Sequence, residues 1–266
     1  MGLNIIVCAK QVPDPEGPPS SFEINEAELK VTARGIPPVI NPFDENALEA
    51  AMRIKESHEQ VSITLISMGK GISKAVILKA VAVGADASLL VEGDSLDASL
   101  LDSFATARLL AAAVARAGGY DLVLCGRQAA DTNAGLVGLG LAQLLGIPAI
   151  TLAQKVDVAG DGVVVERVLP DGYEVVEAPL PALVTVSGEV GDLRYPSLQA
   201  IKAAKAIPQT VLGLADLDLD PSTLGRVRTV ALAAPSRERR CKMVEGETPE
   251  EAGRNLVLAL RQDKVI

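Results

Sequence analysis

The sequence predicts an α/β protein built on a doubly wound parallel sheet, with flavodoxin-like layering of helices over it. An apolar strand, a short turn and a helical segment follow one another about four times between residues 3 and 153. Hydrophobic residues make up 48% of the chain and aromatic residues only 2%, so the core must consist of Val, Leu, Ile and Ala. Such aliphatic strands are typical of parallel sheets that are buried on both faces.

The strands of this sheet are predicted from short apolar runs at Leu3–Cys8, Val61–Ser67, Ala87–Val91, Leu122–Cys125 and Ala149–Ala153. Asn41 can cap a helix and Pro42 suits its first position, so a helix is expected from there. A long helix is expected from about Asp97 to Ala117. Residues 23–40 predict a short hairpin or excursion.

The second half of the chain has a different pattern. Two strand-like runs within residues 156–179 flank Pro170-Asp171-Gly172 and predict an added hairpin. Leu183–Val186 returns to the core, residues 187–196 form an exposed loop, and a short basic helix follows. Residues 207–240 lack periodicity and predict an extended arm, which ends in a C-terminal helix that begins near Thr248. We therefore divide the chain into an α/β domain, residues 1–205, and an arm, residues 206–266.

The stretch from Tyr120 to Pro148 carries the clearest functional signal. A buried strand ends at Gly126, the polar turn RQAADTNAG follows, and an apolar helix comes next. The N–H groups of such a turn and of a helix N-terminus bind anions, so we expect a nucleotide phosphate there. Asp131 fits two roles in this turn, a helix cap or an acceptor for a ribose or flavin group.

Charge and composition exclude several other functions. The net charge of −9 argues against a nucleic-acid partner, because the phosphate backbone would be repelled. Three cysteines without metal-ligand spacing indicate the reducing cytoplasm and no metal site. No apolar run reaches the ~20 residues that span a bilayer, so no membrane insertion is expected.

Templates for catalysis by side chains are missing from the sequence. It contains no HExxH, GxSxG, GxGxxG or Walker motif and has a single histidine. Two classes of nucleotide-binding protein remain: a redox carrier whose cofactor does the chemistry, and a stand-alone nucleotide sensor of the universal-stress type. The arm favours the carrier, because a carrier needs a partner.

Several segments occur in an order and at intervals that match a known family. They are VCAKQVPD, INPFDENALEAAMRIKE, GADASLLVE, DLVLCGRQAADTNAGLVG, LPALVTV and LRYPSLQAIKAAKA. Over nearly all of its length the chain resembles the beta subunit of electron-transfer flavoproteins. The resemblance implies a heterodimer with an alpha subunit that carries FAD, and a second nucleotide, FAD or structural AMP, in the beta subunit. Where the beta subunit holds FAD, NADH is the typical electron donor and electron bifurcation is an expected activity.

The resemblance also assigns site residues by position. It implies that the nucleotide is bound by Cys8, Ala9, Lys10, Asn41, Pro42, Phe43, Asp44, Met68, Gly69, Asp102, Ser103, Thr106, Gly126, Arg127, Gln128, Ala129, Asp131, Thr132, Asn133, Ala134, Gly135, Val137 and Gly138. It implies a loop that recognises acyl-CoA-type or other dehydrogenases, made of Ser187, Gly188, Glu189, Val190, Gly191, Asp192, Leu193, Arg194 and Tyr195. Val190 stands where the family places a leucine-type anchor.

Two motifs bear on the choice between FAD and AMP. Asp102-Ser103-Phe104-Ala105-Thr106 closely matches the Asp-Thr-x-Ala-Thr of FAD-holding members and favours FAD. From the residues alone, Ser103 and Thr106 share a helix face, and the alternative is that both are helix-cap hydroxyls. The turn at residues 131–138 departs from the family's Asp-x-Asp-Thr-x-Gln-x-Gly, because its second acid, its threonine and its glutamine are all replaced. AMP therefore remains the alternative nucleotide.

Overall fold

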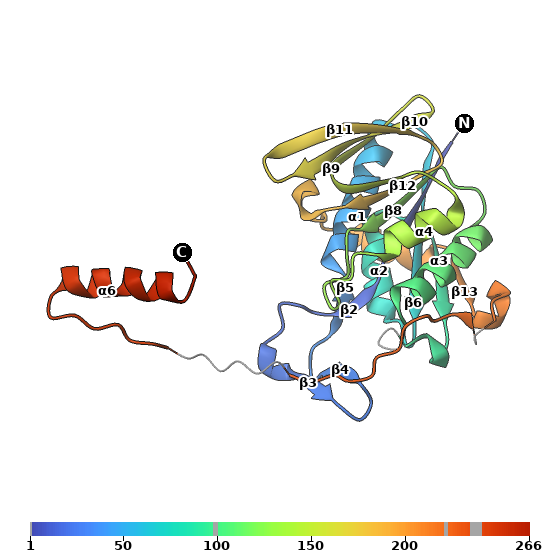
Figure 1. Ribbon diagram of the computed structural model, residues 1–266. Helices are drawn as coiled ribbons and strands as arrows, with labels where there is room; N and C mark the ends of the chain where they lie inside the picture. The colour runs from blue at the N-terminus through green and yellow to red at the C-terminus, as the bar shows by residue number, and fades with distance from the viewer. Residues whose placement is uncertain (1, 98–100, 221–222, 235–240) are drawn as a thin grey trace. The chain divides into compact units, whose positions relative to one another are not determined.

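A computed structural model describes residues 2–97, 101–220, 223–234 and 241–266. It confirms the α/β fold class, and it divides the chain into two compact units, Met1–Leu232 and Ala233–Ile266. The first unit contains, among the described residues, a nine-stranded sheet with the order β11-β10-β9-β12-β8-β1-β6-β7-β13 (Figure 1). The strands of this sheet are β1 Leu3–Cys8, β6 Val61–Gly69, β7 Ala87–Glu92, β8 Leu122–Gly126, β9 Ala149–Ala159, β10 Gly162–Leu169, β11 Gly172–Pro179, β12 Ala182–Val186 and β13 Gln209–Leu212.

Seven neighbouring strands, β9-β12-β8-β1-β6-β7-β13, run parallel to one another. The hairpin β10–β11 adds two antiparallel strands at the edge beyond β9. From β1 the chain builds outward to β6 and β7 and then returns to place β8 on the opposite side of β1. This reversal creates a topological switch point between β1 and β8. The order β7-β6-β1-β8 differs from that of flavodoxin, so a specifically flavodoxin-like layering stays a prediction.

Two apolar clusters lie on opposite faces of the sheet because side chains alternate along each strand. Ile5 and Val7 of β1 belong to the cluster that includes α1 and α2. Ile6 and Cys8 belong to the cluster that includes α3 and α4. The helices of the first unit are α1 Pro42–Ser57, α2 Lys74–Val83, α3 Ser103–Ala117, α4 Val137–Leu145 and α5 Leu198–Ala203.

Several boundaries differ from the sequence prediction. The expected run at residues 156–169 is divided by a turn at Gly160, whose φ of 62° suits glycine, so β9 extends into the added hairpin. The expected start of the long helix falls near residues 98–100, which lie outside the described residues, and α3 begins at Ser103. Short antiparallel pairs flank the first turn, with β3 Phe22–Asn25 against β4 Lys30–Ala33 and β2 Gln11–Pro13 against β5 Pro38–Ile40.

Strand β13 comes from the segment where the sequence showed no periodicity. Its residues pair with Ser88–Val91 of β7 and extend the sheet by one parallel strand. The first unit accordingly runs to Leu232, although an extended arm was expected from residue 206. The predicted domain boundary at residue 205 stays a prediction.

The second unit contains α6, Pro249–Gln262, which begins where the sequence indicated. Thr248 caps this helix by accepting a hydrogen bond from the Glu251 N–H at 3.2 Å. Leu256, Val257 and Leu258 are exposed on α6. A search of the described residues for a helix that is long and apolar enough to cross a membrane finds none.

Candidate functional site

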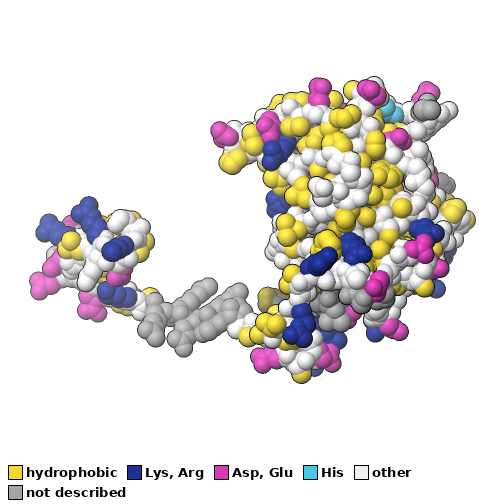
Figure 2. All heavy atoms as spheres, turned by 45° about the vertical axis from the view of Figure 1, so that its right-hand side comes forward, with side chains coloured by type: hydrophobic (Ala, Val, Ile, Leu, Met, Phe, Trp, Pro, Cys, Tyr) yellow, Lys and Arg dark blue, Asp and Glu magenta, His cyan; other side chains and the backbone are white. Residues whose placement is uncertain are grey.

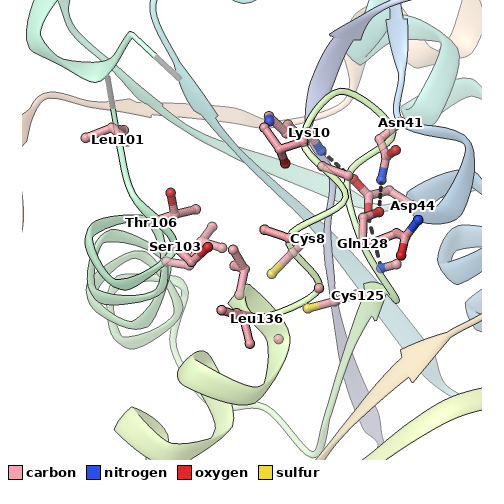
Figure 3. Close-up of a pocket in the computed structure, with 18 of the residues that line it drawn as sticks. Cys8, Lys10, Asn41, Asp44, Leu101, Ser103, Thr106, Cys125, Gln128 and Leu136 are labelled. Carbon is pink, nitrogen blue, oxygen red and sulfur yellow. Dashed lines mark hydrogen bonds between the residues drawn. The ribbon is translucent and has the colours of Figure 1, made fainter. Parts of the chain in front are cut away.

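A cavity of about 490 Å³ lies at the carboxyl ends of β1 and β8, at the switch point of the sheet (Figure 3). Open α/β sheets bind their ligands at such points. Its predicted lining residues are Cys8, Ala9, Lys10, Asn41, Asp44, Met68, Asp102, Ser103, Thr106, Gly126, Arg127, Gln128, Ala129, Thr132, Ala134, Gly135, Val137 and Gly138. The structure therefore brings together segments that are separated by more than a hundred residues in the sequence.

The N-terminus of α1 connects the two strands that flank the switch point. Asp44 accepts hydrogen bonds from the backbone N–H of Lys10 at 2.7 Å and of Gly126 at 3.0 Å, so one carboxylate joins the ends of β1 and β8. The Asn41 side chain donates to the Gln128 carbonyl at 2.8 Å and accepts from the Ala130 N–H at 2.9 Å. Asn41 occupies the N-cap position of α1 as the sequence predicted, but its side chain holds the polar turn in place and makes no capping hydrogen bond to the helix.

Asp44 is buried, and burial raises the pKa of its carboxyl to about 7. The two backbone N–H groups favour the charged form, but the cost of desolvation outweighs them. The carboxyl therefore changes charge near neutral pH while it holds both strand ends.

Gly126 allows the close approach of α1 to β8. A Cβ atom at this position would lie 2.5 Å from Asp44 Oδ1 and 2.6 Å from the backbone carbon of Phe43. Gly138 is similarly crowded, because a Cβ atom there would lie 2.7 Å from Thr185 Cγ2. Both glycines are therefore needed for packing around the cavity.

Two thiols lie at the floor of the cavity (Figure 3). Cys8 and Cys125 are register partners on β1 and β8, and both are buried. Contact with Cys8 together with burial raises the pKa of the Cys125 thiol well above its usual value. A protonated thiol is a poor nucleophile, so we assign this pair no covalent chemistry.

Helices α3 and α4 form the opposite wall. Ser103 and Thr106 face the cavity from α3, and Thr106 Oγ1 also donates to the Asp102 carbonyl at 3.0 Å. The residue before α4, Leu136, provides no side-chain cap, so the N–H groups of its first turn have no side-chain acceptor there. An uncapped helix N-terminus in a cavity suits a phosphate group.

Arg127 offers a further donor to an anion. Its guanidinium lies 4.6 Å from the centre of the Phe43 ring, and its buried Nε atom has no hydrogen-bond partner among the described residues. A buried donor without an acceptor is costly, and a phosphate oxygen in the cavity would satisfy it. The residues present therefore fit a nucleotide phosphate.

Five of the predicted nucleotide-binding residues are not part of the cavity lining. The Phe43 ring lies against the Arg127 guanidinium, and Asp131 forms an ion pair with Lys10 Nζ at 2.7 Å. Asn133 accepts a hydrogen bond from the Gln128 side chain at 2.9 Å. Pro42 is the first residue of α1, and Gly69 is the last residue of β6. Their contribution to nucleotide binding stays a prediction.

The predicted recognition loop, Ser187–Tyr195, is fastened to α1. The Arg194 side chain donates to Glu49 at 3.0 Å and also to Glu56, and Asn46 Nδ2 donates to the Gly191 carbonyl at 2.7 Å. Burial alone would raise the pKa of Glu49, but the hydrogen bonds from Arg194 and Arg53 lower it. The same helix thus begins at the cavity and supports this loop.

Side chains of the recognition loop differ sharply in exposure. Val190 is only 5% exposed and packs in the core, whereas Tyr195 is 95% exposed. In this conformation Tyr195, and not Val190, is exposed, and the role of the loop in recognising a dehydrogenase stays a prediction.

Comparison with known proteins identifies the family. The family described as "Electron transfer flavoprotein domain" matches residues 28–217. The chain is 37% identical over 269 residues to "Electron transfer flavoprotein subunit beta" of Thermoanaerobacterium thermosaccharolyticum, covering 99% of this chain and all of that protein. The chain belongs to the electron transfer flavoprotein beta-subunit family.

Two further relatives support this assignment. The beta subunit of Megasphaera elsdenii is 34% identical over 98% of this chain and 93% of its own length. A protein of Acetobacterium woodii, "Caffeyl-CoA reductase-Etf complex subunit CarD", is 32% identical over 99% of this chain and 100% of its own length. The resemblance found in the sequence is thereby confirmed.

Some residues of this beta subunit line the cavity without having been predicted. They are mostly apolar: Leu96, Leu101, Phe104, Leu110, Cys125, Leu136 and Val227. Leu110 could have been found, because it lies four residues after Thr106 on the same helix face. Cys125 directly precedes Gly126 in the strand. Val227 lies in the segment that the sequence predicted as an arm, and no pattern there indicated contact with the site.

Proposed function

We propose that this beta subunit binds FAD in the cavity at the switch point, and that with its alpha subunit it passes electrons between dehydrogenases and other acceptors. NADH would be the electron source, and the pair would bifurcate electrons. The observation that carries the choice of FAD is the placement of Ser103 and Thr106 in the cavity wall. These are the hydroxyls that the FAD-holding members of the family share.

The size of the site also supports the larger nucleotide. A second hollow of about 470 Å³ shares Leu101, Asp102 and Val227 with the first. A ligand that extends past these shared residues would have room for both the adenosine and the flavin portions of FAD. Bound FAD would supply the redox chemistry. The protein would bind its phosphates through the α4 N-terminus and Arg127.

The second candidate is a carrier that holds structural AMP here. The first hollow alone falls within the usual size range of small-molecule sites, and the substitutions at residues 131–138 remove side chains that the family uses. Family membership favours both carriers over the stand-alone sensor, because a beta subunit implies an alpha-subunit partner. The exposed apolar residues of α6 suit the arm for binding that partner.

Flavin counting tests the proposal. The subunit is co-expressed with its alpha subunit, the yellow complex is denatured, and the released nucleotides are quantified by chromatography. Two FAD molecules per heterodimer support the proposed function. One FAD and one AMP per heterodimer would instead establish the AMP-holding carrier.

A further inference from the structure

The segment that follows β13 turns back to the cavity. We propose that residues 223–227, here called the strap, retain the bound nucleotide, and that Asp102 is the positioning residue that fastens the strap. The inference rests on the proposed function only in requiring a nucleotide, FAD or AMP, in the cavity.

The Asp102 carboxylate makes three hydrogen bonds to backbone donors. Its Oδ1 accepts from the Ala105 N–H at 2.6 Å and so caps α3. Its Oδ2 accepts from the N–H groups of Arg226 and Val227, each at 2.6 Å. Both oxygens therefore accept hydrogen bonds from the protein itself. This arrangement favours a structural role for Asp102 over a direct contact with the ligand.

Other contacts hold the strap over the start of α3. The Arg108 guanidinium donates to the Thr223 carbonyl, and Leu224, which is 6% exposed, belongs to the same apolar cluster as Leu110. Arg226 places its guanidinium 5.2 Å from the centre of the Phe104 ring. Phe104 lines the cavity, so the strap packs on a wall of the site.

The position of Val227 shows where the strap meets the cavity. Together with Leu101 and Asp102 it borders both hollows, and it stands at the point where they meet. The strap therefore lies against a nucleotide in the first hollow, and a nucleotide that extends into the second hollow passes along it. Release of the strap would remove this contact without disturbing the phosphate turn at residues 127–135.

The substitution Asp102→Asn separates the two roles of this residue. Asparagine is as good a helix cap as aspartate, so α3 is retained. Its amide nitrogen, however, replaces the oxygen that accepts from Arg226 and Val227, which places donor against donor. Two charge-assisted hydrogen bonds to the strap are then lost, and a cost of roughly 1.4 kcal/mol or more should make nucleotide release about tenfold faster.

The experiment uses the heterodimer and measures nucleotide release after dilution, by flavin fluorescence or by chromatography for AMP. Asp102→Asn and Val227→Pro, which deletes one strap donor, should both accelerate release. Asp171→Asn removes a carboxylate from the β10–β11 turn, away from the strap and from both hollows, so this control should behave like the unsubstituted complex. If Asp102→Asn accelerates release and Val227→Pro does not, Asp102 contacts the ligand directly and the strap proposal fails.

A second readout does not depend on the nucleotide. Trypsin cleavage after Arg226, relative to cleavage after the exposed Arg34 outside the strap, reports whether the strap is fastened. Asp102→Asn should increase this ratio about tenfold, and an unchanged ratio would overturn the proposal. A complex that carries no nucleotide in the beta subunit would refute the proposed function, while the cleavage ratio would still decide the role of the strap.

Discussion

Gly126 occupies a position that no other residue can fill without moving α1. We expect Gly126→Ala to lower the free energy of unfolding by about 1–3 kcal/mol, because its Cβ would meet Asp44 and the Phe43 backbone at less than contact distance. Urea unfolding measures the effect. Gly119→Ala is the matched control, since a Cβ there would meet no atom within 4 Å. Equal effects at the two positions would contradict the packing argument.

Asp44 should make stability depend on pH. The pKa of this carboxyl is about 7 in the folded protein and 3.8 in the unfolded chain. The contribution of protonated Asp44 to the free energy of unfolding is therefore fully present below pH 4 and is lost as the pH rises to about 7. The loss should amount to roughly 4 kcal/mol over this window. Asp44→Asn removes the ionisable group. The difference between the two unfolding curves should slope between pH 4 and pH 7, and a flat difference would show that burial does not shift this pKa.

Ser103 and Thr106 provide the hydroxyls that favour FAD. Replacing both with Ala should release the flavin of the beta subunit and leave the flavin of the alpha subunit, so that the FAD content falls from two to one per heterodimer. Chromatography of the denatured complex measures the content. Ser62→Ala with Thr210→Ala is the control, because both hydroxyls are exposed and neither lines the cavity. Retention of both flavins would remove the argument for FAD from these residues.

At the scale of elements, α1 links the cavity to the recognition loop. Arg194→Gln would break the ion pairs with Glu49 and Glu56 and leave Glu49, which is 5% exposed, with the Arg53 side chain and the backbone N–H of residue 194 as partners. We expect faster hydrogen exchange across residues 187–195 and a loss of stability of about 1–3 kcal/mol.

Arg53→Gln serves as the control for the loop, since Arg53 pairs with Glu49 and approaches Gly191 but makes no hydrogen bond to the loop among the described residues. It should leave hydrogen exchange in residues 187–195 unchanged. If both substitutions loosen the loop equally, the charge on Glu49, and not the bridge from Arg194, determines its order.

The repeated elements could be predicted from the sequence because each has a local signal. Leu3–Cys8 is apolar except for Asn4, and Ser197 and Thr248 cap helices as their positions indicate. Open α/β sheets bind ligands at the carboxyl ends of their strands, and the phosphate turn predicted after Leu122–Cys125 indeed lines the cavity found there. The role of Asp131 was harder to predict, because its ion pair with Lys10 forms only where two turns meet in the folded chain.

Strand β13 could not be predicted in the same way. Gln209–Leu212 is only four residues long and contains no alternation that distinguishes it from the irregular segment around it. Its pairing is decided by the free edge of β7, a tertiary partner. Val227 was missed for the same reason, since its place at the cavity follows from the Asp102 carboxylate and not from its neighbours in the chain.

For the whole molecule, two truncations distinguish the predicted and observed boundaries. A chain that ends at Leu232 keeps the complete first unit and should unfold at nearly the same temperature as the full chain, while losing affinity for the alpha subunit. A chain that ends at residue 205 lacks β13, exposes the edge of β7 and should aggregate. Calorimetry and light scattering measure both outcomes. A soluble, cooperative fragment 1–205 would show that β13 is dispensable.

The pairing of β13 with β7 also has a consequence for synthesis. A ribosome completes residues 88–91 long before residues 209–212 emerge, so the growing chain carries an open strand edge through most of its translation. Any chaperone that shields this nascent chain must leave that edge in time for the parallel partner to join. The pairing of β13 with β7 therefore waits for translation to reach residue 212. Slowing the ribosome after residue 92 should prolong the interval in which nascent chains can aggregate through the open edge of β7.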